Sequence, residues 1–171
     1  MTDITQITEK LDGIKAQYDA AVAAIRDNGG LKDIFTAFFE KNPQFKAISW
    51  TQYIPSFNDG DPCTFTISEP FVTTSDAASL DSSDWEYSTP EEEDDWDYAE
   101  TFTAEEKWLW DEPKVDGQVQ RIPNPDINQD LKDIVSFINN NEDLMEKLFG
   151  SYCRIIVTPE KILVEEYDCG Y

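Results

Sequence analysis

Carboxylates and large aromatic side chains are interleaved in one stretch of this sequence, residues 76–112. Fifteen acids stand there against one base, so this fifth of the chain carries −14 of the formal net charge of −23. Concentrated negative charge attracts cationic partners and repels phosphate and anionic lipid. The predicted partner-binding residues are Asp84, Glu86, Glu91, Glu92, Glu93, Asp94, Asp95, Asp97, Glu100, Glu105, Glu106, Trp96 and Tyr98. We expect the partner to be a basic protein surface, with no direct contact to nucleic acid or membrane.

Three interpretations of residues 76–112 remain open from the sequence. The run EEEDD at residues 91–95 is typical of a flexible, solvated segment. Seven aromatics in the same stretch argue instead for an ordered surface, in which strand alternation buries aromatics and points carboxylates outward. Same-face carboxylates would then lie about 6.6 Å apart, a spacing suited to imitating the phosphates of a nucleic-acid strand. Alternatively, the segment is an exposed acidic and aromatic peptide that folds onto its partner.

Most common hydrolase designs are excluded by composition. The chain has no histidine, which removes serine–histidine and cysteine–histidine catalysis, and its seven glycines form no phosphate-binding loop. Carboxylates alone could still act as acid and base or hold Mg²⁺ or Mn²⁺. We predict no catalytic residue, no metal ligand and no cofactor.

Two acidic motifs suggest cation sites and are interpreted otherwise. The run DINQD at residues 126–130 has the first three ligand spacings of an EF-hand, but Leu131 replaces the required glycine and Phe137 the bidentate glutamate. The run NDGD at residues 58–61 could collect a cation, although such residues more often build a tight turn.

Length and composition predict one soluble domain. The 171 residues suffice for one hydrophobic core, and 40% of them are hydrophobic. Cys63, Cys153 and Cys169 lack paired spacing, which favours reduced thiols. No run approaches the length of a membrane span, and the N-terminus lacks a signal-peptide pattern. We expect a cytoplasmic protein, in the host cytoplasm if a phage encodes it.

The N-terminal segment predicts an amphipathic helix. Apolar residues recur at alternating spacings of three and four and so share one helical stripe. These residues are Ile4, Ile7, Leu11, Ile14, Tyr18, Ala21 and Ile25. The stripe is interpreted either as packing within the domain or as the seam of a coiled-coil homodimer.

The remaining pattern predicts an α+β fold. A second helix over residues 31–41 should form an antiparallel hairpin with the first. Residues 45–54 and 63–72 predict one β-hairpin, residues 152–157 and 162–169 another, and two helices are centred on residues 131–138 and 144–149, after a loop at 115–128. We therefore expect a single domain over residues 1–171, in which two β-hairpins form an antiparallel sheet covered by helices, with residues 76–112 as an acidic insertion.

The segment at residues 45–67 also carries a family resemblance. Its WTQY followed by FNDGDPC is similar to a pattern in small uncharacterised proteins of tailed bacteriophages and prophages. The resemblance covers about 23 residues and implies no activity. It implies a context in which small acidic proteins inhibit a host defence or nucleic-acid enzyme.

The leading hypothesis is thus a non-enzymatic, phage-type inhibitor that presents a nucleic-acid-mimicking carboxylate surface to a basic host protein. The alternatives are a toxin-neutralising immunity-type protein, a carboxylate-dependent Mg or Mn metalloenzyme, and a structural component of a virion.

Overall fold

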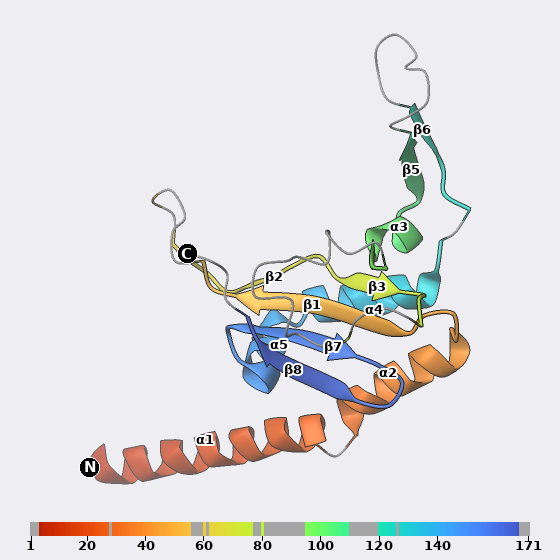
Figure 1. The fold of residues 1–171 in the computed structure, drawn as a ribbon. Coiled ribbons are helices and arrows are strands. Elements are labelled where there is room, and N and C mark those ends of the chain that lie inside the picture. The colour runs from red at the N-terminus through yellow and green to blue at the C-terminus, as the bar shows by residue number, and fades with distance from the viewer. Residues whose placement is uncertain are drawn as a thin grey trace.

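The computed structural model describes residues 4–27, 29–55, 60, 62–76, 80, 95–109, 120–125 and 127–167, and of residues 4–9, 26–27 and 108–109 only the backbone. The helices are α1 (Ile4–Asp27), α2 (Gly30–Lys41), α3 (Glu100–Thr103), α4 (Gln129–Asn139) and α5 (Glu142–Phe149). The strands are β1 (Ala47–Tyr53), β2 (Thr66–Ile67), β3 (Phe71–Thr73), β4 (Asp97–Tyr98), β5 (Glu106–Leu109), β6 (Gln120–Pro123), β7 (Cys153–Val157) and β8 (Ile162–Glu166). The predicted α+β class is confirmed (Figure 1).

One antiparallel sheet organises the fold. Its strand order is β4-β3-β1-β7-β8, and β2 also pairs with β1. The two predicted hairpins merge as expected, because β1 pairs with β7 from Ile48 opposite Val157 to Gln52 opposite Cys153. The first hairpin has a divided second strand: β2 and β3 are separated around Pro70, whose nitrogen has no hydrogen to donate to a ladder.

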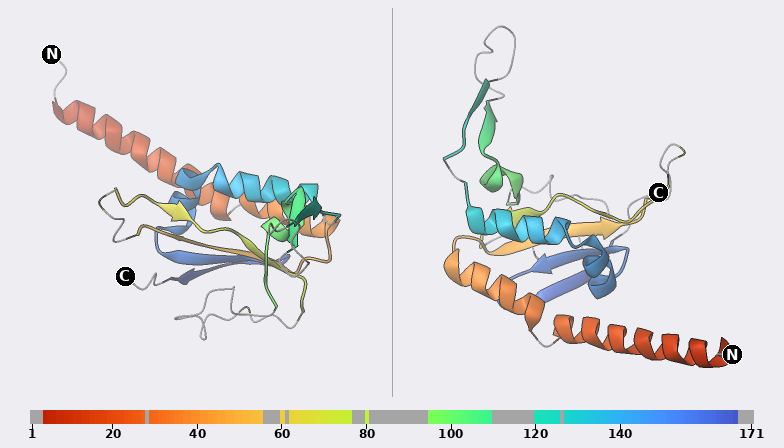
Figure 2. Two further views of the ribbon diagram at one scale, coloured as in Figure 1. Left: turned by 90° about the horizontal axis from the view of Figure 1, so that it is seen from above. Right: turned by 180° about the vertical axis from the view of Figure 1, so that it is seen from behind.

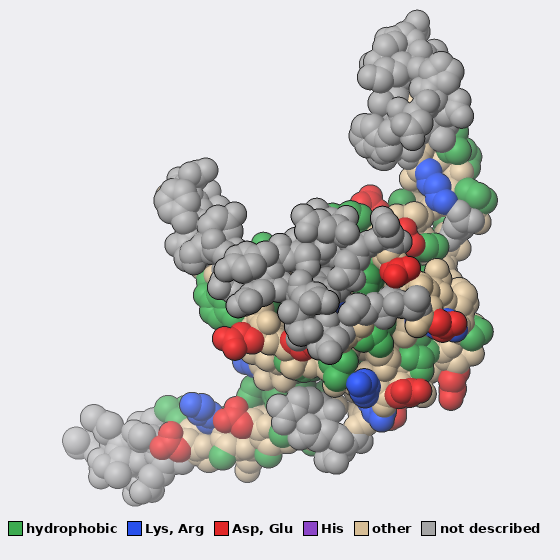
Figure 3. All heavy atoms as spheres, viewed as in Figure 1, with side chains coloured by type: hydrophobic (Ala, Val, Ile, Leu, Met, Phe, Trp, Pro, Cys, Tyr) green, Lys and Arg blue, Asp and Glu red, His purple; other side chains and the backbone are tan. Residues whose placement is uncertain are grey.

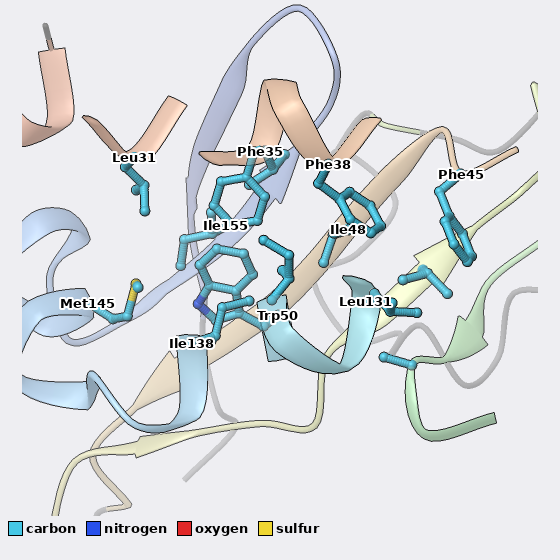
Figure 4. Packing of buried hydrophobic residues seen from close by; sticks show 14 of the residues in the cluster. Leu31, Phe35, Phe38, Phe45, Ile48, Trp50, Leu131, Ile138, Met145 and Ile155 are labelled. Atoms are coloured by element: carbon cyan, nitrogen blue, oxygen red, sulfur yellow. The ribbon is translucent and has the colours of Figure 1, made fainter. Parts of the chain in front are cut away.

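Helices α2, α4 and α5 cover one face of this sheet (Figure 2). Alternation along β1 points Ile48 and Trp50 into that layer. The Trp50 ring is 1% exposed and stacks on Phe35 with ring centroids 6.2 Å apart (Figure 4). Its indole Nε1 donates to Gln52 Oε1 at 3.2 Å, and Gln52 Nε2 donates to the carbonyl of Met145 at 3.1 Å. The buried polar groups of β1 thus tie the sheet to α5.

The predicted antiparallel hairpin of the first two helices is wrong. Gly29 has φ of 118°, a left-handed conformation that glycine adopts without strain. The chain nevertheless does not fold back there, and α1 extends away from the body while α2 lies along the sheet (Figures 1 and 2). The stripe residues Leu11, Ile14 and Tyr18 are exposed, so the chain's own core does not bury them.

The predicted loop at residues 115–128 contains a strand. β6 pairs with β5 in a separate two-stranded sheet, from Glu106 opposite Pro123 to Leu109 opposite Gln120. This pair stands out from the body as an arm (Figure 1). Residues 120–123 lack the alternating apolar residues that identify a half-buried strand, and none of the described core residues comes from β5 or β6.

Asn128 and Asp130 of the DINQD run lie at the start of helix α4 and contact α2. Asn128 precedes α4, and its Oδ1 accepts from the backbone N–H of Leu131 at 2.9 Å. Its Nδ2 donates to Asn42 Oδ1 at 2.9 Å, which joins the start of α4 to the end of α2. Asp130 pairs with Lys41 in the same network.

Candidate acidic interface

Residues of the acidic segment pack against part of the second face of the sheet. Side chains that alternate with the helix-facing ones form a smaller cluster there. Its buried members are Ala47, Phe71, Trp96 and Ile156, with Leu80 and Leu163 packed against them. Trp96 and Leu80 come from the segment 76–112, so part of this segment belongs to the folded body.

Trp96 is the buried anchor of this contact. Its side chain is 6% exposed, and the guanidinium Cζ of Arg154 lies 5.8 Å from the ring centroid, a cation–π distance. Arg154 on β7 is itself 3% exposed, and its Nε donates to Ser49 Oγ at 3.0 Å. Among the described residues, Arg154 is the only buried charged side chain. The indole therefore lies over a polar strip of the sheet as well as over apolar side chains.

The carboxylates on either side of Trp96 are exposed. Asp95 precedes Trp96, and Asp97 begins β4, which pairs with β3 so that Val72 lies opposite Asp97. Tyr98 lies opposite Phe71, with ring centroids 4.3 Å apart, and is 38% exposed. The alternation expected from the run DDWDY thus holds at residues 95–97, with acids outward and the tryptophan inward. β4 ends the sheet, and charged side chains on such an edge also discourage strand addition.

The pairing of β3 with β4 adds an acid that the sequence analysis missed. The backbone N–H of Ala99 donates to the Pro70 carbonyl at 2.8 Å, which brings Glu69 beside the start of α3 at Glu100. Burial, and then the charge of Glu100, raise the pKa of the Glu69 carboxyl. Glu69 lies outside the charged run, and only strand pairing relates it to residues 95–100. We call Glu69, Asp95, Asp97 and Glu100 the acidic edge.

Two of the predicted binding residues are paired with cations at the base of the arm. Glu105 Oε1 lies 3.5 Å from Lys132 Nζ, and Glu106 Oε2 lies 3.3 Å from Arg121 Nη1. Such exposed pairs contribute about 0–1 kcal/mol and are readily exchanged for other partners. Acidic side chains, drawn in red, gather around this base in Figure 3. Glu105 and Glu106 therefore extend the acidic edge with partly neutralised charge.

Six predicted site residues lie outside the described part of the chain. They are Asp84, Glu86, Glu91, Glu92, Glu93 and Asp94. Most of the NDGD run is outside it as well, although Gly60 is described and has φ of 95°. Among the described residues, no group of three or more His, Cys, Asp or Glu side chains is arranged to hold a metal ion.

Comparisons with protein-family models, curated proteins and solved structures each found no match. None of the described helices combines the length and apolar character that a membrane crossing needs.

Proposed function

We propose that this chain is a non-enzymatic acidic binding protein, whose acidic edge occupies a basic protein surface in place of nucleic acid. The observation that carries the proposal is the burial of Trp96 between two exposed carboxylates, Asp95 and Asp97. A buried anchor fixes the backbone, so less conformational entropy is lost when the carboxylates meet a partner.

The charge state of the acidic edge supports this proposal. Within the described part of the chain, Asp95, Asp97 and Glu100 form no ion pair. Burial, and after it the neighbouring charge of Glu100, raise the pKa of Glu69, so a cation placed between these two carboxylates would relieve repulsion. Lysine and arginine side chains of a nucleic-acid-binding groove supply such cations.

The partner class follows from the same electrostatics. Surfaces evolved to hold a phosphate backbone carry clustered positive charge, and a strongly negative protein is steered to them at low salt. The resemblance of residues 45–67 to phage and prophage proteins suggests one form of the proposal, an inhibitor of a nucleic-acid-acting host protein.

Competition for DNA tests the proposal. The purified chain is titrated into complexes of a fluorescent DNA duplex with candidate host nucleases, modification enzymes and nucleoid proteins, at about 50 mM salt where phosphate contacts are strongest. We expect the chain to displace the duplex from at least one of them. The proposal is contradicted if the chain displaces DNA from none of the candidates at this salt concentration.

A matched pair of variants locates the effect. The double variant Asp95→Asn with Asp97→Asn should weaken competition about tenfold, which corresponds to about 1.4 kcal/mol. The control is Glu40→Gln with Glu160→Gln, two exposed acids on α2 and on the β7–β8 turn, which removes the same charge. Equal weakening by both pairs would show that net charge, and not the acidic edge, is responsible.

A further inference from the structure

The apolar stripe of the N-terminal helix is exposed at four of its described side chains. Its described members Leu11, Ile14, Tyr18 and Ile25 are 60%, 54%, 47% and 39% exposed. Contact with the body lies toward the C-terminal end of α1, where Val22 packs against the core. At Tyr18, Lys147 Nζ of α5 lies 5.2 Å from the ring centroid. The N-terminal half extends away from the body (Figures 1 and 2).

Such a helix needs a partner for its apolar stripe. Most helical stability in proteins comes from packing of an amphipathic face, and isolated helices are marginal in water. The stripe repeats with spacings of three and four over the whole helix, which places Leu11 and Tyr18 at a positions and Ile14 at a d position of a heptad. That periodicity suits another helix with the same repeat, because knobs of each fill holes of the other.

We propose that two copies of this chain associate through α1 as an antiparallel two-stranded coiled coil. The first reason for the orientation is the charge beside the seam. Lys10 and Lys15 occupy g and e positions, and a parallel pair would set Lys10 of each helix against Lys15 of the other. With Leu11 opposite Ile14 in an antiparallel pair, Lys10 instead approaches Gln17, which is neutral.

The second reason is the charge of the attached bodies. Each copy has a formal net charge of −23, and its body lies at the C-terminal end of α1. A parallel pair would place both bodies at the same end. An antiparallel pair with Leu11 opposite Ile14 places the C-terminal ends of the two α1 helices about 44 Å apart at 1.5 Å per residue. That is several times the screening length of about 8 Å at physiological salt.

The surface beside the stripe also has room for the end of a second helix. An open groove of about 490 Å³ lies between α1 and the α4–α5 turn, lined by Tyr18, Leu144, Lys147 and residues 139–143. In the antiparallel register the N-terminal turns of the second copy pass Tyr18 and reach this groove. In a parallel pair the bodies of both copies would compete for the same space.

Sedimentation of the full chain against concentration tests the association. We expect a reversible monomer–dimer equilibrium, and at least a tenfold weaker association for Leu11→Asp with Ile14→Asp. The matched control, Ala16→Asp with Ala20→Asp, adds the same charge to exposed positions of α1 outside the seam and should still dimerise. Circular dichroism checks that each variant keeps its fold. The proposal is overturned if the wild-type chain stays monomeric at a protein concentration of about 100 μM, which corresponds to a dimer weaker than about 5.5 kcal/mol.

A spin-label distance tests the orientation. Cys63 and Cys169 are replaced by serine, and a label is placed through Ala24→Cys, an exposed position near the C-terminal end of α1. In the antiparallel register the two labels lie about 35 Å apart along the helix axes, against less than about 20 Å in a parallel pair, whose axes are about 8–10 Å apart. The short distance would overturn the antiparallel arrangement.

Discussion

Trp96 is the buried aromatic through which the acidic segment packs on the second face of the sheet. Trp96 packs with Phe71 and Ile156 on the sheet face that the helices leave open, and its ring faces Arg154. The exposed carboxylates Asp95 and Asp97 depend on this contact for their position. If the proposed partner binds these carboxylates, its affinity should therefore depend on the stability of the cluster beneath them.

Removing this indole should cost stability and binding together. Trp96→Ala should lower the free energy of unfolding by about 3–5 kcal/mol, since a large buried aromatic is replaced by a cavity. Urea denaturation measures the loss. Trp96→Phe keeps most of the apolar contact and serves as the control, with a clearly smaller loss. A Trp96→Ala variant as stable as the wild type would contradict the role of Trp96 as an anchor.

At the scale of elements, helix α4 is fixed by the polar residues that precede it. Asn128 caps α4 and at the same time donates to Asn42 at the end of α2. These two contacts hold neighbouring helices over the same face of the sheet. Asp130 of the DINQD run pairs with Lys41 at the end of α2 and adds another contact between the two helices.

Loss of this cap should destabilise the helical layer. We expect Asn128→Ala to lower the free energy of unfolding by about 1–2 kcal/mol, because one backbone N–H of α4 loses its acceptor. Asn128→Asp retains the acceptor and loses only the donation to Asn42, so it should cost less. Asn139→Ala, at an exposed position of the same helix, is the control for helix propensity. Thermal unfolding of the three variants measures the order, and equal effects would argue against capping.

The elements that the sequence predicts are determined by residues within the element, and the others are determined by contacts with distant segments. Residues 31–41 and 153–157 have apolar patterns and stop signals within a few residues, so α2 and β7 follow from the sequence. The strand β6 and the direction of α1 do not. Among the described residues, β6 pairs with β5 outside the core, and α1 contacts α5 at Tyr18 and the core cluster at Val22.

At the scale of the whole molecule, the net charge acts in opposite directions on the two proposed associations. In the proposed function the acidic edge would attract a basic partner, whereas two copies of a chain with charge −23 repel each other. Salt screens both interactions. The two associations should therefore be separable by ionic strength alone.

We expect salt to weaken partner binding and to strengthen self-association. Raising salt from about 50 to about 500 mM shortens the screening length from above 10 Å to below 8 Å. DNA competition should then fall while the sedimentation dimer becomes tighter. A dimer that dissociates as salt rises would show that attraction between charges, and not the apolar stripe, holds the copies together.

The sequence by itself determined the α+β class, most element positions, the absence of histidine chemistry and the concentration of charge in residues 76–112. These properties depend on composition and on periodicities of two or 3.6 residues, which are local. Only the tertiary structure decided that Trp96 is buried, that Glu69 joins Glu100, and that the α1 stripe remains exposed. Each of these depends on which distant segment comes to lie alongside, and strand pairing and helix packing fix that between residues far apart in the chain.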